Sequence, residues 1–519
     1  MQHDFSPPSL ALPPPNVLLD PKHWRYKNEG NANVIFSSTC KDWQCSHLAL
    51  RVRKSCSPNG SRSPSPTSPF AEATSLSSIE YANRVIAPLV GPEYIVPMCA
   101  YRVTELFLKD LEAQSRLSRP DYRTHQSIDL TQEEVILTVD LTSHSRIARQ
   151  SRARLGVGSS SKVMAVEVKP KWGFLPLSPF LSPDSEKRQT CRFCMKRHYN
   201  QGIEHSFFPD SPLSEYSFED IPEKNHFCPL DLYSSDSTRI SRALGALYAS
   251  SRNNFRLFNS DGVVLQPDKW STHVYKFFEP LLHQAKGSIR MDSVDHRGDE
   301  DGPLHRLLTP IIRYVLQQDP VLARLKMWQA WLDYWDIEIL WPMVDQFVKN
   351  LKDPRDQASL LAPPTSKEWQ ETVSRVQNPG YRSMHRKVPD TFTEIRHAIL
   401  EYLLSATLKD CSFIINFNLE PVRVAGEAEH PKDDGSKLSD NTVIRHIYVL
   451  MSDDDGHLVV APSLTEIQGS TTQWIRLGYT VQIVDVDPKP VDKLKLYHLK
   501  DQSILAAYRS QENRVFCNP

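Results

Sequence analysis

Residues 163–174 read VMAVEVKPKWGF, and this stretch divides the chain into two parts of different character. Its apolar first half predicts a β-strand, which Pro170 and Gly173 should end, because proline lacks a backbone N–H and glycine favours a break. Glu167, Lys169 and Lys171 place one acid and two bases at the end of that strand. Strand ends that face a cleft are where proteins meet ligands, although an ordinary charged strand exit has the same sequence.

The part before this stretch predicts a small β-rich lobe. Residues 23–38, HWRYKNEGNANVIFSS, and residues 47–54, HLALRVRK, have the pattern of strand, tight turn and strand. In the second segment Leu48, Leu50 and Val52 recur with the period of two of a half-buried strand. VILTVDL, residues 135–141, predicts a further strand.

The part after it predicts a larger, mainly helical lobe. Residues 239–250, 305–316 and 323–341 have the apolar pattern of buried or half-buried helices, and residues 442–452 and 479–487 add strands. The predicted fold is α+β and kinase-like, with two lobes, a β-sheet at the cleft and a nucleotide between the lobes. The expected divisions are a disordered tail over residues 1–19, an N-lobe over 20–160 and a C-lobe over 161–519.

The composition is that of a globular chain without an overall bias of charge. Hydrophobic residues make up 40 % of the 519 residues and the formal net charge is -1, which argues against a surface built for nucleic acid. Nine cysteines in so long a chain fit reduced thiols better than a disulfide framework. No run of about 18 apolar residues occurs and the start lacks a signal-peptide pattern, so we expect a soluble protein of the nucleus or cytoplasm, without a membrane partner.

A serine-rich and proline-rich insertion interrupts the first lobe. Residues 56–78, CSPNGSRSPSPTSPFAEATSLSS, contain four Ser-Pro steps and few apolar side chains, so they bury too little surface to offset the entropy of ordering. We expect this insertion to be disordered. Phosphorylation of the Ser-Pro steps is one interpretation, and a tolerated loop without a function is the other.

The turn Asn28–Asn33 between the first two strands is a candidate phosphate-binding element. Glycine and small polar residues let backbone N–H groups approach an anion, and Arg51 or Arg53 on the next strand could reach the same phosphates. A plain hairpin turn and a solvated strand face explain the same residues.

Two aspartates stand at the ends of apolar strands. Asp410 opens DCSFIINF and Asp485 lies in YTVQIVDVDPKP, where a carboxylate facing a cleft is a natural magnesium ligand or base. Asn253 and Asn254 precede Arg256, so one amide could bind a metal ion, the other a substrate oxygen, and the guanidinium a phosphate. N-caps, a helix-ending turn and surface charge are the alternatives.

Lys489, Lys493 and Tyr497 follow Asp485 at a spacing of four residues. With Pro490 placed to start a helix, this spacing puts two ammonium groups and a phenol on one helical face. Such a stripe suits a ligand with many phosphates, although a solvated helix face has the same pattern.

Cys191 and Cys194 form a Cys-x-x-Cys pair, with His198, His205 and Cys228 nearby in the chain. The pair has zinc-ligand spacing, but no second Cys-x-x-Cys exists and the intervening loops are irregular. A redox role is disfavoured because the surroundings do not predict a βαβ unit. We therefore expect no zinc.

Nine segments between His23 and Tyr508, taken in order, resemble the inositol-pentakisphosphate 2-kinase family. They are EGNANVIF, LRVRK, VEVKPKWGFLP, CRFCMKR, CPLDLYSSD, RNNFRLF, DIEILWP, KDCSFIINF and VDVDPKPVDKLKLYHL. The Glu-x-Lys-Pro-Lys element at residues 167–171 is the family signature. The resemblance implies a fold distantly similar to protein kinases and ATP- and Mg²⁺-dependent phosphorylation of the 2-hydroxyl of inositol 1,3,4,5,6-pentakisphosphate, which gives inositol hexakisphosphate (phytate).

The resemblance also implies roles for individual residues. Asp410 would be the catalytic aspartate, assisted by Lys169, and Asp485 and Asn254 would hold magnesium. The residues implied for ATP, with His144 near the adenine, are Gly30, Asn31, Asn33, Arg51, His144, Glu167 and Lys169. The residues implied for the inositol phosphate are Arg123, Lys171, Asn253, Arg256, Lys489, Lys493 and Tyr497.

Three features depart from the family pattern. Asn200 stands where the family has an inositol-binding lysine, so Lys196 or Arg197 would substitute. Lys493 replaces a common arginine, which keeps the charge and loses the bidentate geometry. Plant members have a Cys/His zinc site between the DIE and DCS segments, and no cysteine lies between Trp341 and Asp410, so we expect that site to be absent.

Two other classes of protein fit the sequence less well. A non-catalytic inositol-phosphate-binding scaffold would keep the lysines but would have no reason to keep both Asp410 and Asp485. A protein kinase is disfavoured because neither H-R-D-x-x-x-x-N nor D-F-G occurs. We therefore expect an enzyme, monomeric, whose partners are the small molecules ATP and inositol pentakisphosphate, and not nucleic acid.

Overall fold

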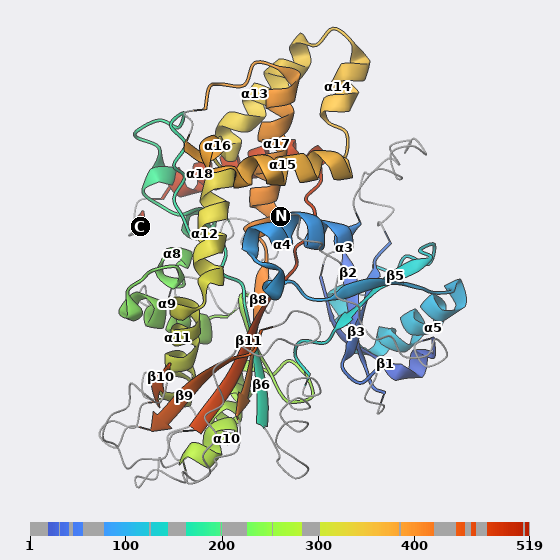
Figure 1. The fold of residues 1–519 in the computed structure, drawn as a ribbon, viewed down its shortest axis with the longest axis vertical. Coiled ribbons are helices and arrows are strands. Elements are labelled where there is room, and N and C mark those ends of the chain that lie inside the picture. The colour runs from blue at the N-terminus through green and yellow to red at the C-terminus, as the bar shows by residue number, and fades with distance from the viewer. Residues whose placement is uncertain are drawn as a thin grey trace.

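The structure, a computed structural model, combines many helices with two separate antiparallel sheets (Figure 1). The residues that it describes are 19–30, 32–40, 45–55, 77–123, 126–143, 162–197, 199, 226–251, 253–282, 302–383, 386–419, 443–451, 458–462, 475–511 and 514–517. The mixed α+β class predicted from the sequence is confirmed.

The N-terminal sheet has five strands in the order β1-β2-β3-β5-β4. Their bounds are β1 Trp24–Glu29, β2 Asn33–Ser38, β3 Leu48–Arg53, β4 Met98–Arg102 and β5 Glu134–Val139. Helix α5, Glu105–Ser115, begins at Thr104, whose side chain accepts a hydrogen bond from the Phe107 N–H, as N-cap residues do. The apolar face of α5 enters the same buried cluster as Leu50 of β3, so the sheet has a core of its own.

The C-terminal sheet has six strands in the order β10-β9-β11-β8-β6-β7. Their bounds are β6 Lys162–Val168, β7 Phe255–Phe258, β8 Ser412–Leu419, β9 Arg445–Met451, β10 Leu458–Ala461 and β11 Ile475–Val484. Every residue of β8 is buried, which fits its central place and its nearly continuous apolar sequence.

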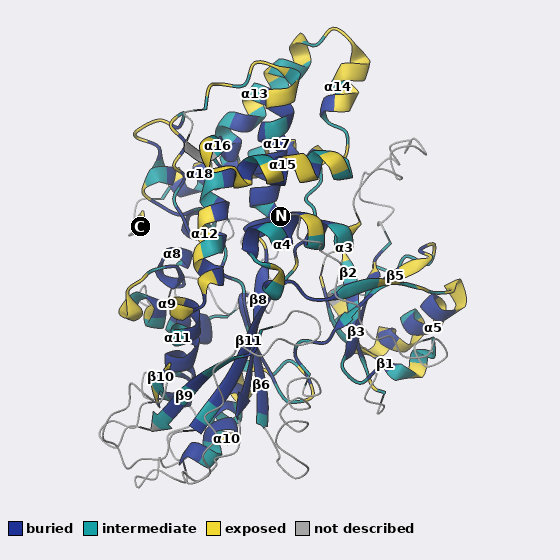
Figure 2. Cartoon of the chain, in the orientation of Figure 1, coloured by how far each residue is buried: buried dark blue, intermediate teal, exposed yellow. Residues whose placement is uncertain are grey.

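Helices surround this sheet and extend beyond its β8 and β11 end (Figure 1). The bounds of the α-helices other than α5 are α3 Ser78–Tyr81, α4 Ala87–Val90, α8 Pro229–Leu232, α9 Ser237–Ala249, α10 Trp270–Leu282, α11 Thr309–Gln318, α12 Pro320–Leu332, α13 Asp336–Asn350, α14 Pro354–Leu360, α15 Ser366–Gln377, α16 Pro379–Ser383, α17 Phe392–Leu408 and α18 Leu494–Arg509. Figure 2 shows α17 buried along much of its length, whereas α14 and α5 carry exposed residues. The apolar sides of these helices and of the C-terminal sheet form one large core.

The elements predicted from sequence periodicity are present. The strands expected over residues 135–141 and 163–168 correspond to β5 and β6, and those expected over 442–452 and 479–487 correspond to β9 and β11. The three helical segments correspond to α9, to α11, and to α12 with α13. Their apolar periodicity was therefore sufficient to identify them.

Residues 56–76 of the expected Ser-Pro insertion lie outside the described residues, and its last two residues, Ser77 and Ser78, stand at the start of α3. Ser77 caps α3: its Oγ accepts from the Glu80 N–H at 3.2 Å, and its own N–H donates to the Glu80 carboxylate at 3.3 Å. This reciprocal pair satisfies two backbone donors at the helix start. A helix of four residues with mixed composition left no periodicity to mark it in advance.

Cys40 and Cys45 are joined by a disulfide in the loop between β2 and β3. The expectation of reduced thiols is wrong for this pair, because a count of cysteines over the whole chain carries no information about two that a local loop brings together. The other described cysteines are free thiols: Cys99, Cys191, Cys194, Cys228, Cys411 and Cys517. Cys56 lies outside the described residues.

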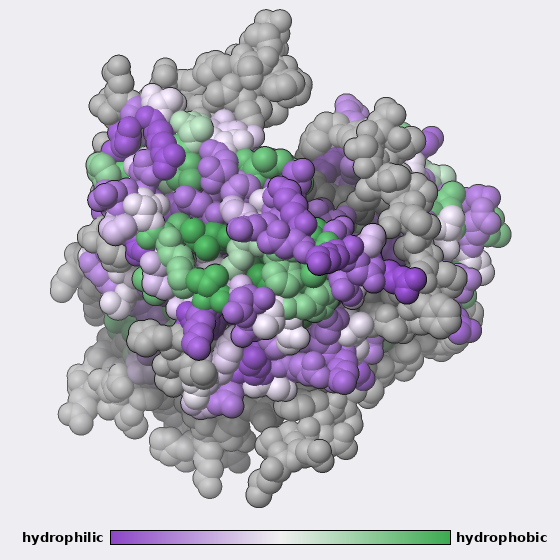
Figure 3. All heavy atoms as spheres, turned by 90° about the horizontal axis from the view of Figure 1, so that it is seen from above, coloured by the Kyte–Doolittle hydropathy of each residue, from purple (hydrophilic) through white to green (hydrophobic). Residues whose placement is uncertain are grey.

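Within the described part of the chain, none of the helices has the length and apolar character needed to cross a bilayer. The face at the α13 end is largely covered by hydrophilic residues, with apolar ones between them (Figure 3). The apolar residues gather near the middle of this view, with hydrophilic residues around them (Figure 3).

Candidate active site

Three strand ends of the C-terminal sheet bring the main candidate residues to one edge. β8 pairs antiparallel with both neighbours, with Val168 of β6 opposite Phe413 and Val484 of β11 opposite Ser412. The last residues of β6 and β11 therefore lie beside the first residues of β8. Asp410, Lys169 and Asp485 are each within two residues of these ends, and the register alone makes them neighbours.

Asp410 lies between two lysines. Lys489 Nζ donates to Asp410 Oδ2 at 2.7 Å, and Lys171 Nζ is 4.0 Å from Oδ1. Partial desolvation raises the pKa of this carboxyl, but the charges of Lys489, Lys171 and Lys169 outweigh it and hold the pKa below its ordinary value. Since its side chain is 60 % exposed, Asp410 is an ionised carboxylate that a ligand can reach.

Asp485 is held by Lys169 and Ser412. Its Oδ2 accepts from Lys169 Nζ at 3.2 Å and from Ser412 Oγ at 3.3 Å. Lys169 Nζ also lies 3.6 Å from Glu167 Oε1. Burial lowers the pKa of Lys169, but the two carboxylates outweigh burial and raise it, so Lys169 is a permanent cation.

Asn254 lies beside this region and has a buried polar side-chain atom without a partner in the described structure. Its backbone oxygen accepts from the Lys169 N–H at 2.8 Å, while its side-chain Oδ1 is buried with no hydrogen-bond partner in the described structure. A buried polar atom left unpaired is costly and calls for an explanation. An amide oxygen is a suitable ligand for a hard cation such as Mg²⁺.

Glu167 and Arg256 face each other across β6 and β7. They are register partners, and Arg256 Nη1 lies 3.1 Å from Glu167 Oε2. Asn253, next to buried Asn254, is exposed. The β6–β7 pair therefore places a guanidinium and an exposed amide near the Lys169 end of the site.

Lys171 and Asp485 both have left-handed backbone, with φ of 60° and 63°. L-residues with side chains seldom adopt this region, and such strain is common at functional sites. The Lys171 carbonyl accepts from Gln329 Nε2 at 3.0 Å and from Tyr233 Oη at 3.2 Å. Buried contacts thus hold Lys171 in its unusual conformation.

Lys196 joins the basic side of the site. Burial, followed by the charges of Lys500, Lys171 and Arg192, lowers the pKa of Lys196 to about 8. The charge of Lys171 lowers the pKa of Lys196, and the charge of Asp410 acts in the opposite direction. Lys500 is a further cation of this cluster, and sequence reasoning missed it because nothing local distinguishes it from other lysines of α18.

The predicted stripe of Lys489, Lys493 and Tyr497 is only partly helical. The helical segment begins at Val491, with a 3₁₀ turn Val491–Lys493 before α18, so Lys489 lies in the loop ahead of it. Lys489 contacts Asp410 nonetheless, and burial followed by the charges of Asp410 and Asp492 raises the pKa of Tyr497 to about 12. Lys493 lies one turn before Tyr497.

The turn after β1 connects to the same edge through Arg51. With the Asn33 amide oxygen turned towards it, Asn33 accepts from Arg51 Nε at 3.1 Å and Nη2 at 2.8 Å. Arg51 also forms an ion pair with Asp487, two residues beyond Asp485. Among the described residues other than its chain neighbours, none has an atom within 4 Å of the position that a Cβ would take at Gly30.

Three candidates remain apart from this group or outside the described residues. Arg123 lies beside the buried ion pairs of the first lobe, where its carbonyl accepts from Arg119 Nη2 at 3.1 Å and its charge acts on Lys54. Asn31 and His144 lie outside the described residues, as do Asn200, His198 and His205.

The chain matches the family model described as inositol-pentakisphosphate 2-kinase over residues 26–503. It is 25 % identical to an Arabidopsis thaliana protein named inositol-pentakisphosphate 2-kinase, over 83 % of this chain and 77 % of that protein. A protein of the same name from Danio rerio is 24 % identical, over 77 % of this chain and 83 % of that protein. A protein of that name from Cryptococcus neoformans is 26 % identical, over 78 % of this chain and 84 % of that protein.

The match extends over all the strand ends and the basic cluster described above. Similarity of this extent to proteins that share one name supports a kinase function on inositol phosphates. The chain belongs to the inositol-pentakisphosphate 2-kinase family and is an enzyme of that family.

Proposed function

We propose that this enzyme transfers the γ-phosphoryl group of ATP to the 2-hydroxyl of inositol 1,3,4,5,6-pentakisphosphate and releases ADP and inositol hexakisphosphate. One observation carries the proposal: an ionised aspartate, Asp410, lies between Lys489 and Lys171, one strand away from the Lys169 and Asp485 pair. Phosphoryl transfer requires an acceptor site rich in cations and a neighbouring set of ligands for the nucleotide phosphates.

Asp410 accepts the proton of the 2-hydroxyl. As it does so, the hydroxyl oxygen bonds to the γ-phosphorus, and the bond between the γ-phosphorus and the β-phosphate oxygen of the departing ADP breaks. A carboxylate with a lowered pKa is a weak base, which suits a reaction in which the hydroxyl is oriented first and loses its proton late. The same lysines that keep Asp410 ionised offer positive charge to the substrate's phosphates.

Lys169, Arg51 and the turn at Gly30, Asn31 and Asn33 bind the ATP phosphates, with Glu167 orienting Lys169 and His144 near the adenine. Asp485 and the Asn254 amide oxygen would hold Mg²⁺, which would supply positive charge beside the transferred phosphoryl group. The unpaired buried Oδ1 of Asn254 supports this assignment.

Five phosphates demand a concentration of cations that a chain of net charge -1 must supply locally. The inositol phosphate site consists of Lys171, Asn253, Arg256, Lys489, Lys493 and Tyr497, with Arg123 as an outer contact. We add Lys196, whose pKa is lowered by burial and then by the charges of Lys500, Lys171 and Arg192, in the role of the lysine that the family has at Asn200.

The separate cores of the two sheets support a two-lobed, kinase-like arrangement, with an N-lobe over residues 20–160, a C-lobe over 161–519 and the nucleotide between them. The Arg51–Asp487 ion pair joins the two. The helical segment of residues 78–90 packs with the larger core.

The test is to incubate the purified chain with Mg²⁺-ATP and inositol 1,3,4,5,6-pentakisphosphate, to separate the products by anion exchange and to locate the new phosphate by ³¹P NMR. We expect the hexakisphosphate with a phosphate at the 2-position. Tight binding of the pentakisphosphate without conversion would instead support the non-catalytic scaffold.

A further inference from the structure

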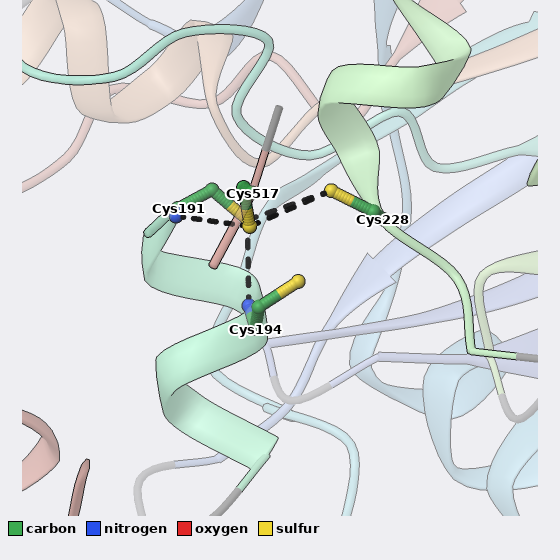
Figure 4. A group of neighbouring side chains, drawn as sticks. All are labelled: Cys191, Cys194, Cys228 and Cys517. Atoms are coloured by element: carbon green, nitrogen blue, oxygen red, sulfur yellow. Dashed lines mark hydrogen bonds between the residues drawn. The ribbon is translucent and has the colours of Figure 1, made fainter. Parts of the chain in front are cut away.

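Four cysteine thiols from three distant segments meet at one point (Figure 4). Cys191 and Cys194 stand at the start of a helix over residues 192–197, Cys228 is the N-cap residue of α8, and Cys517 lies in the C-terminal segment. The four sulfurs are all within 4.8 Å of one another.

The spacing of these sulfurs fits a shared metal ion. Cys228 Sγ is 4.0 Å from Cys191 Sγ and 3.9 Å from Cys517 Sγ. Zinc lies about 2.3 Å from each of four tetrahedral thiolates, which places neighbouring sulfurs about 3.8 Å apart. A disulfide would need about 2.05 Å, and the structure describes all four as free thiols.

Backbone N–H groups are directed at two of the sulfurs. The Cys194 N–H donates to Cys191 Sγ at 3.4 Å, and the Cys191 N–H donates to Cys517 Sγ at 3.4 Å. Such donors stabilise the negative charge of metal-bound thiolates and fix their orientation. Dashed lines in Figure 4 mark these hydrogen bonds.

The C-terminal segment is held in place by contacts other than the thiols. The Cys517 N–H donates to the Gln189 carbonyl at 2.9 Å, and the Val515 carbonyl accepts from Thr190 Oγ at 2.9 Å. These bonds position Cys517 beside Cys191 independently of any ion, so the ligand set is already assembled.

The surroundings favour a closed, structural site. Cys191 and Cys194 are buried together with Leu230, and Leu175 and Phe193 pack against them. Four thiolates fill the tetrahedral coordination of zinc and leave no position for water or substrate.

We propose that Cys191, Cys194, Cys228 and Cys517 bind one zinc ion that ties the C-terminal segment to the helix over residues 192–197. Four thiols lose their protons as four Zn–S bonds form, so each zinc displaces up to four protons, and no electrons are transferred. The proposal reverses our expectation from the sequence of no zinc. It also differs from the plant Cys/His site, since none of its ligands lies between Trp341 and Asp410.

The test is the metal content of the full chain, purified without chelator and with any affinity tag removed. We expect about one zinc per chain in the wild type and in the control Cys99→Ser, and about 0.1 or less in Cys517→Ser. Circular dichroism verifies that the variants are folded.

Cobalt replacement makes the test independent of any variant. The wild type loaded with Co²⁺ should show intense thiolate-to-cobalt charge transfer and the visible bands of tetrahedral cobalt. Equal zinc in wild type and Cys517→Ser, no zinc uptake by the metal-free wild type, or cobalt spectra without thiolate bands would overturn the proposal, as would a disulfide among the four cysteines in the mass spectrum.

Discussion

Lys489 Nζ donates a hydrogen bond to Asp410 Oδ2 at 2.7 Å, although the two residues are 79 positions apart. The lysine lowers the pKa of the carboxyl and lies beside the proposed acceptor site. It thus contributes both to the charge state of the base and to substrate binding, and these two contributions can be separated by pH.

Replacing Lys489 with Met should move the acid limb of kcat/KM to higher pH. The carboxyl loses the cation that lowers its pKa, so Asp410 is protonated at a pH where the wild type is still ionised. Lys489→Arg keeps the charge and should leave that limb in place. A Met variant with a raised KM but an unmoved acid limb would contradict the coupling.

Lys196 should make substrate affinity depend on pH in the basic range. Its pKa is about 8, so the ammonium loses its proton and a phosphate contact as pH rises. We expect KM for the inositol phosphate to rise several-fold between about pH 7 and about pH 9, and to rise less in Lys196→Arg, which stays charged. Identical profiles for the two proteins would remove Lys196 from the site.

Alanine substitutions at Asn254 and Asn253 should affect different kinetic constants, although the two residues are adjacent. Asn254→Ala removes the unpaired buried oxygen and should raise the Mg²⁺ concentration for half-maximal rate about tenfold. Asn253→Ala changes an exposed amide and should act on KM for the inositol phosphate instead. Titrations of each variant with Mg²⁺ and with substrate separate the two effects, and equal responses would contradict the assignment.

Lys187 is a stability residue of the larger core. It is buried between Asp336 and Asp501, with 2.8 Å from its Nζ to the Asp501 carboxylate. Lys187→Met leaves two buried carboxylates short of a cation and should lower the free energy of unfolding by about 3–5 kcal/mol. The control Lys349→Met breaks an exposed pair with Asp345 and should cost less than about 1 kcal/mol. Urea unfolding measures both, and similar losses would contradict the prediction.

Local patterns predicted the strands and helices because apolar periodicity depends on which face is buried. The same patterns placed Asp410, Lys169 and Asp485 at strand ends, and strand pairing then made them neighbours. Lys489 was assigned to a helix that begins two residues later, yet its contact with Asp410 is present.

What sequence reasoning missed depends on contacts between distant segments. Cys517 is 289 positions from Cys228, so ligand spacing along the chain could not join it to the Cys191 pair. Lys500 differs from other lysines of α18 only in what the fold packs around it. The Arg51–Asp487 pair spans 436 positions and likewise has no local signal.

The most direct test of the central claim compares turnover with binding in Asp410→Asn, which keeps the shape of the side chain and removes its charge and basicity. The account predicts that kcat falls by about 10²–10⁴-fold, while calorimetry shows that inositol pentakisphosphate still binds with a Kd within about threefold of wild type. The control Asp345→Asn should retain full activity. An Asp410→Asn enzyme that keeps more than about a tenth of wild-type turnover would contradict the role of Asp410 as the base.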